Sequence, residues 1–293
     1  MSQIFTNKPE GIATNNNIKD IDSFFNKFIV EDKTTNFYLI VPTGKLTRHL
    51  IKYYISLYWK HHKKPTEKPN IFTIQGFANT LFKELNFTAK KNVISDSYQF
   101  ILFKNVFDKL NEDKYFAKFK SNYEFVHTLY KFIKGLREKS SLSQSQKEHF
   151  KIVDKDKFEL ISDLYFEYDK ALSHDYDYSK VLNELSKDIN FDKCSNFFQN
   201  KELVFIYGFT DFNLPEINFF TKLAEQEIEV SFSLNYNSNN SQLFKNLINI
   251  SKTLIEHKFK HTNKEDLNLF NSNDIETNLS EFCLLYTSPS PRD

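Results

Sequence analysis

Cysteine is almost missing from this sequence, which has two among 293 residues, Cys194 and Cys283. Neither belongs to a CxxC pair and neither has a histidine at ligand spacing, which excludes a disulfide framework and a zinc site of the usual patterns. Such sparing use of cysteine predicts a reducing, cytoplasmic location. Runs of about 18 apolar residues are also missing, so we expect no membrane-spanning helix and no membrane partner.

The chain also has no excess of positive or negative charge. The chain has Lys+Arg 39 and Asp+Glu 38, a formal net charge of +1, so any contact with nucleic acid must come from a local basic patch. Glycine is rare, at 5 residues, whereas Phe 32 and Tyr 15 are abundant. With many asparagines and few arginines, this composition is typical of AT-rich coding DNA, so aromatic abundance alone does not indicate a base-stacking surface. At 293 residues with 40% hydrophobic content, the chain can bury a sizeable core.

Two strand–helix units follow one another in the first third of the chain. The apolar run of residues 37–41 ends at Pro42, and the apolar residues behind it recur at helical spacing: Leu46, Leu50, Tyr53, Tyr54 and Leu57. After a basic loop, "IFTI" has the pattern of a short strand and "QGFANTLFKEL" that of a helix. Strands that alternate with helices predict an α/β fold with a parallel sheet.

A block of helices then interrupts this pattern. Residues 96–187 carry three helical stripes without a strand signal, and a basic run on one of them indicates a solvated polar face: Lys131, Lys134, Arg137 and Lys139. From residue 203 an apolar strand, a helix opened by Pro215 and a further strand return. We therefore predict the first part of an α/β domain over residues 1–95, a helical insertion over 96–200, the return to the α/β domain over 201–282 and a non-native tail over 283–293.

That tail reads "CLLYTSPSPRD" and differs abruptly from the rest of the chain. It resembles the translation of a mosaic-end adaptor used in transposase-based sequencing libraries. This resemblance predicts that native sequence stops at about Phe282 and that the natural protein continues further. A proline-containing linker or a Ser-Pro phosphorylation site is the alternative interpretation.

The turn "VPTGKLT" contains part of a phosphate-binding loop. Such a loop needs a glycine five positions before Gly44 and a Ser or Thr after Lys45 to hold magnesium. Leucines occupy both positions, Leu39 and Leu46, so ATP hydrolysis is not predicted. The turn can still offer Thr43, Lys45 and Arg48 to an anion such as a nucleic-acid phosphate at a helix N-terminus. A plain helix cap with solvated cations is the alternative.

Two further segments carry candidate residues. "FTIQGFA" places Thr73 and Gln75 at the carboxyl end of a strand, where open α/β sheets bind ligands. "LVFIYGFTDFNLPE" has Gly208 where an ATP-driven motor would carry an Asp-Glu pair. We interpret Gly208 as a tight turn and Asp211 or Asn213 as a helix cap, and Gly208 with Asp211 as the remnant of a degenerate nucleotide site.

In this order, four segments resemble the N-terminal half of AddB-type proteins, the helicase–nuclease subunits of bacterial double-strand-break repair: "YLIVPTGKLTRHL", "IFTIQGFANTLF", "VISDSYQFILFKNVF" and "LVFIYGFTDFNLPEINFFTKLAEQEIEVSFSLNY". The resemblance is strongest to the compact branch of PD-(D/E)xK nuclease family proteins. It covers roughly residues 36–282, and "GFTDFNLPE" with the helix and strand behind it is the most specific piece.

The resemblance implies a P-loop-helicase-like core of superfamily 1 with a large all-helical insertion, in which Thr43, Thr73 and Gln75 approach DNA phosphate. It also implies DNA and an AddA-like subunit as partners. Beyond residue 282 it implies a PD-(D/E)xK nuclease that needs magnesium, and the iron–sulfur cluster of some family members. No catalytic residue, cofactor or metal ligand is predicted within this chain, because the sequence departs from working helicases at both nucleotide motifs and contains no recognisable nuclease centre.

The sequence therefore predicts a non-motor DNA-binding scaffold that positions DNA for a nuclease domain outside this chain. Two alternatives stay open. One is an ATP-binding helicase subunit with an irregular phosphate loop, and the other is a protein-interaction scaffold without a DNA role.

Overall fold

The computed structural model describes the following parts of the chain: residues 2–7, 20–85, 93–110, 116–139, 155–173, 175–188, 195–226, 228–235 and 242–263. The tail over 283–293 and both cysteines lie outside them. In chain order the elements are β1 (Ser2–Asn7), α1 (Ile21–Val30), β2 (Phe37–Val41), α2 (Gly44–His62), β3 (Ile71–Thr73), α3 (Ile74–Glu84), α4 (Asp96–Leu110), the 3-10 helix η2 (Ala117–Phe119), α5 (Tyr123–Lys139), α7 (Lys155–Ala171), α8 (Tyr178–Asp188), α9 (Ser195–Phe198), β4 (Leu203–Tyr207), α10 (Leu214–Ala224), β5 (Glu229–Asn235), α11 (Lys245–Glu256) and β6 (Lys260–Asn263).

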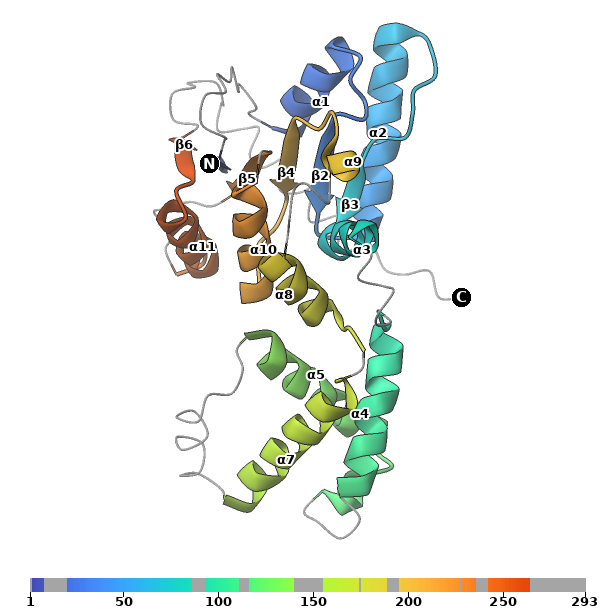
Figure 1. Cartoon of the computed structure of the whole chain (residues 1–293), viewed down its shortest axis with the longest axis vertical. Helices are drawn as coiled ribbons and strands as arrows, with labels where there is room; N and C mark the ends of the chain where they lie inside the picture. Colours follow the sequence, from blue (N-terminus) through green and yellow to red (C-terminus); the bar gives the residue numbers. More distant parts are fainter. Residues whose placement is uncertain are drawn as a thin grey trace.

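In the described residues, six strands form one sheet in the order β3-β2-β4-β5-β1-β6 (Figure 1). Neighbours among β3, β2, β4 and β5 run parallel, whereas β1 lies antiparallel to both β5 and β6. The predicted α/β class with a parallel sheet is therefore confirmed. The sequence did not indicate β1 and β6, which extend the sheet at the side of β5.

Helices cover both faces of the parallel strands. In β2, Phe37, Leu39 and Val41 pack with α1 and α2, whereas Tyr38 and Ile40 pack with α3, α8 and α10. All five side chains are buried, as expected for a strand covered on both faces. This burial explains why the strand is an uninterrupted apolar run.

The chain changes direction across the sheet between β2 and β4. From β2 it passes through α2 to β3 at the outer edge, and from β4 it passes through α10 to β5 on the other side. The pair β2–β4 is therefore the topological switch point, and the carboxyl ends of these two strands are where open α/β sheets bind ligands.

The helical block has a hydrophobic cluster of its own, formed by α4, α5, α7 and the segment around η2. Figure 1 shows α4, α5 and α7 set apart from the sheet. Both ends of the block meet beside the α/β part, because Val93 bridges Tyr176 and the Ile94 amide donates to the Tyr176 carbonyl at 3.0 Å.

Helix α8 packs instead in the hydrophobic cluster of the sheet, through Val181, Leu182 and Leu185, together with residues of α3 and α10. The division of the chain at residues 95, 200 and 282 stays a prediction. The packing of α8 favours an insertion that ends before Tyr178.

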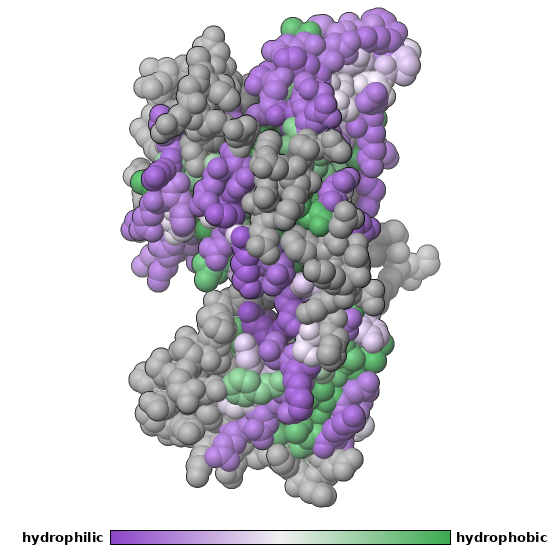
Figure 2. Space-filling model, viewed as in Figure 1, coloured by the Kyte–Doolittle hydropathy of each residue, from purple (hydrophilic) through white to green (hydrophobic). Residues whose placement is uncertain are grey.

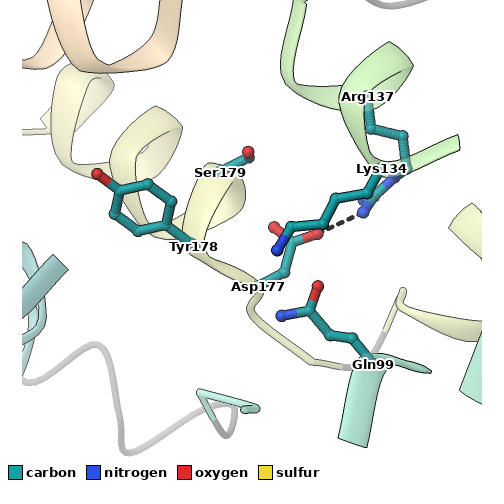
Figure 3. A pocket seen from close by; sticks show the side chains of 6 residues that line it. All are labelled: Gln99, Lys134, Arg137, Asp177, Tyr178 and Ser179. Carbon is teal, nitrogen blue, oxygen red and sulfur yellow. Dashed lines mark hydrogen bonds and ion pairs between the residues drawn. The ribbon is translucent and has the colours of Figure 1, made fainter. Parts of the chain in front are cut away.

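The prediction of a solvated basic face is wrong for Arg137 on α5. Its side chain is 8% exposed and pairs with Asp177, which is 5% exposed, and it lies 2.9 Å from Asp169 Oδ1. Figure 3 shows this pair together with Lys134, which comes from the same helix. Asp177 also accepts from the Lys180 amide at the start of α8. Arg137 therefore joins the helical block to α8, and a charge pair buried this deeply is costly to break.

We predict opposite effects from Gly135→Ala and Gly208→Ala. Gly135 lies inside α5, and a Cβ added there would have no neighbour within 4 Å, so the free energy of unfolding should rise by about 0.5–1 kcal/mol. Gly208 has φ +79°, so alanine should lower it by about 1–2 kcal/mol. Chemical denaturation followed by circular dichroism measures both changes, and equal signs would contradict the assignment of a left-handed turn at Gly208.

Candidate nucleic-acid interface at the carboxyl edge of the sheet

The candidate residues predicted from the sequence lie along one edge of the sheet. Thr43 follows β2, Thr73 ends β3 and Gly208 follows β4. Because these strands are parallel and adjacent in the order β3-β2-β4, their carboxyl ends meet at the same edge. The structure therefore brings together three turns that are far apart in the sequence, with the turn after β2 in the middle.

The turn after β2 begins a long helix with a hydroxyl cap. Thr43 has an extended backbone, and its hydroxyl oxygen accepts from the Leu46 amide at 3.2 Å. Thr43, Lys45 and Arg48 are exposed, and α2 has no acidic residue in its first turn. Its N-terminus therefore presents the positive end of a helix dipole beside two cations.

The turn after β3 repeats this arrangement. Thr73 caps α3, and its hydroxyl oxygen accepts from the Gly76 amide at 3.1 Å. A Cβ on Gly76 would lie only 3.2 Å from that oxygen, so glycine at this position keeps the cap unstrained. Gln75 is exposed beside the cap, whereas Phe77 is fully buried.

Apolar groups surround the turn after β4. Gly208 has φ +79°, and a Cβ placed on it would lie 3.8 Å from both Leu46 Cδ2 and Pro42 Cδ. Leu46 occupies the position where a phosphate-binding loop has its magnesium-binding hydroxyl, and Gly208 the position of a motor's acidic pair. A side chain at position 208 would therefore be in van der Waals contact with Leu46 across the switch point.

Asn213, rather than Asp211, caps the helix behind this turn. The Asn213 side chain accepts from the Glu216 amide at 2.9 Å, and Glu216 accepts in return from the Asn213 amide at 3.0 Å, which makes a capping box. Asp211 is exposed and accepts from the Phe212 amide. The spacing of an Asn three positions before a Glu is a signal of this box in the sequence itself.

Glu216 also connects this edge to the helices on one face of the sheet. The Tyr178 hydroxyl, at the start of α8, donates to Glu216 Oε1 at 2.7 Å. Burial raises the pKa of the Glu216 carboxyl above its ordinary value, and the hydrogen bonds from Asn213 and Tyr178 oppose this shift. Sequence reasoning missed this contact because Tyr178 lies within the stretch that was expected to belong to the insertion.

A metal site is not formed by the part of the chain that the structure describes, where no group of three or more His, Cys, Asp or Glu side chains could hold an ion. The magnesium and the iron–sulfur cluster implied by the family resemblance thus have no ligand set among these residues. In the same part of the chain, no helix is both long and apolar enough to cross a membrane.

The fold is that of a doubly wound α/β protein, and the candidate edge combines helix N-termini, hydroxyl caps and cations. The family model described as "ADDB, N-terminal" matches residues 21–280. The chain therefore belongs to the AddB N-terminal family, which confirms the resemblance seen in the sequence and indicates a role in AddB-type DNA repair. No curated protein matches the chain.

Thr43→Ala should lower the free energy of unfolding by about 1 kcal/mol, because the Leu46 amide loses its capping oxygen. Thr43→Ser should keep most of the stability. Gln75→Ala, an exposed change beside the neighbouring cap, should stay within about 0.5 kcal/mol of the parent. Urea unfolding measures all three variants. A Thr43→Ala protein as stable as Gln75→Ala would contradict a structural role for the cap.

Proposed function

We propose that this chain is the non-motor, helicase-shaped part of an AddB-type repair protein, and that it binds DNA at the carboxyl edge of its sheet. The contact around Gly208 carries this proposal. A motor needs carboxylates and a hydroxyl around magnesium at the switch point, and Leu46 and Pro42 lie there instead, at ordinary van der Waals distance from the Gly208 position.

With apolar residues at the switch point, the edge has no site for a nucleotide. The groups around it can still attract phosphate. Lys45 and Arg48 are exposed next to the α2 N-terminus, and such cations supply most of the affinity of proteins for a phosphate backbone. The hydroxyls of Thr43 and Thr73 use an oxygen lone pair for their caps, so each still has a proton to donate to a phosphate oxygen. Gln75 adds a side-chain amide at the same edge.

The proposal extends to partners that rest on family membership alone. In the whole protein, this region would dock an AddA-like subunit and position DNA for a C-terminal, magnesium-dependent PD-(D/E)xK nuclease. The ligands of magnesium, and of any iron–sulfur cluster, would belong to that domain, so none of the contacts proposed for this chain involves a metal. The cytoplasmic location stays a prediction from cysteine usage.

DNA binding should depend on Lys45 and Arg48. The full chain should bind a fluorescein-labelled oligothymidylate at low salt, with an affinity that falls linearly on a log–log plot against salt concentration. Each of Lys45→Ala and Arg48→Ala should weaken binding and reduce the slope of that plot by about 0.7, the value for one phosphate contact on a single strand. Fluorescence anisotropy measures both quantities.

Lys170→Ala is the matched control, because Lys170 is an exposed lysine on α7, far from this edge in the chain. It should leave the affinity and the slope unchanged. The absence of binding at low salt would favour a protein-interaction scaffold. Equal effects of all three substitutions would mean that binding follows net charge and not this edge.

An ATP-binding subunit is the rival function, and one observation favours it: Gly44 and Lys45 open α2 directly after β2, as in a phosphate-binding loop. We predict that labelled ATP with magnesium does not bind detectably to the full chain in equilibrium dialysis. Binding that is lost in Lys45→Ala would overturn the non-motor proposal.

A further inference from the structure

Helix α2 has a single sign of charge along its whole length. Its 19 residues, "GKLTRHLIKYYISLYWKHH", contain no Asp or Glu. Positions 45, 48, 52 and 59 are separated by three, four and seven residues, so Lys45, Arg48, Lys52 and Trp59 share one face of the helix. All four are exposed. We refer to these four residues as the α2 track. Figure 2 shows a mainly hydrophilic surface where Figure 1 places α2.

The opposite face of α2 already has its partners. Leu50, Tyr54 and Tyr58 are buried in the cluster with α1 and the sheet. These buried residues, and not the α2 track, therefore hold α2 against the sheet.

Two acidic groups of neighbouring segments contact tyrosines of α2. Asp22 of α1 accepts from the Tyr53 hydroxyl at 2.8 Å. Asp32 accepts from Tyr58 and lies 2.7 Å from Lys64 Nζ. These partners of the two carboxylates lie outside the α2 track.

Trp59 is the unusual member of the α2 track. It is the single tryptophan of the chain and is 52% exposed. A large, half-exposed indole on the same helix face as lysine and arginine side chains is the combination with which proteins bind single-stranded nucleic acid, because bases stack on the ring while cations contact phosphates. Duplex DNA offers the same phosphates, but its base faces are covered by their neighbours.

The length of the α2 track suits a short stretch of one strand. Lys45 and Trp59 are 14 positions apart, which corresponds to about 21 Å along the helix axis, a length that a few nucleotides can span. The α2 track begins with Lys45 at the carboxyl edge of the sheet, so it is continuous with the interface described above.

We propose that the α2 track binds single-stranded DNA, with Lys45, Arg48 and Lys52 on phosphates and Trp59 stacked on a base. This inference rests on the proposed function and specifies it further. The edge of the sheet alone predicts attraction to any DNA. The α2 track adds a preference for single strands and assigns roles to Lys52 and Trp59 that neither the sequence patterns nor the proposed edge site gave them.

Trp59 supplies its own test, because intrinsic tryptophan fluorescence of the full chain reports on this position alone. Titration with an oligothymidylate of about 15 nucleotides, longer than the track, should quench the fluorescence, and added salt should reverse the quenching. A duplex of equal length and poly-glutamate should quench little. Poly-glutamate tests whether the α2 track is instead a surface for an acidic protein.

Variants then connect the signal to affinity, measured by anisotropy of a labelled oligothymidylate. Trp59→Ala should weaken binding about 5- to 150-fold, the range for the loss of one stacked base. Trp59→Phe should restore part of it. Phe132→Ala removes a similarly exposed aromatic ring from α5, 46% exposed, and should change nothing. Lys52→Ala should reduce the salt slope by about 0.7, and Lys170→Ala should not.

The outcomes separate this inference from the proposed function. Binding of the oligonucleotide without quenching, with Trp59→Ala equal to Phe132→Ala, would overturn the α2 track and leave the edge site in place. Quenching by poly-glutamate as strong as by oligothymidylate would assign the face to an acidic protein and overturn the inference. Equal affinity for duplex and single-stranded DNA would contradict the proposed stacking of Trp59 on a base. The absence of any oligonucleotide binding would overturn both proposals.

Discussion

The parallel pairing of β2 with β4 is the constraint on which the rest of the structure depends. Phe37 pairs with Leu203 and Ile40 with Ile206, so this ladder joins segments about 160 residues apart, and forming it carries a large loop-closure cost. Side chains buried on both faces offset that cost, including Phe24, which stacks on Phe205 at 4.8 Å between ring centroids. Once the ladder forms, the turns after β2 and β4 become neighbours.

That neighbourhood also underlies the proposed non-motor role. In a motor, the turns after these two strands bring charge to a nucleotide, whereas here they bring Pro42 and Leu46 to Gly208. Under the proposed non-motor role, the cations and helix N-termini at this edge would keep their attraction for phosphate.

Parts of this fold could be predicted from the sequence, and the missed parts have physical reasons. Strands buried on both faces, such as residues 37–41, are continuous apolar runs and are easy to recognise. The strands β1 and β6 have no such run, and among the described residues each pairs only with segments more than 200 residues away. Helix α1 could have been found, because Asp20 caps it and Phe24, Phe25 and Phe28 recur at helical spacing. The positions of the edge residues followed from the strands, but the approach of Leu46 to position 208 required the register of the sheet.

The helical block leaves and re-enters the α/β part at a single point, where Val93 and Ile94 meet Tyr176. Between those residues the chain builds a separate hydrophobic cluster, and Arg137 and Asp177 join it to the start of α8. A short linker between the two ends would thus leave every strand of the sheet in register. Evolution could exchange or enlarge this block as a cassette, and change what the protein touches there, without altering the edge at which the strands end.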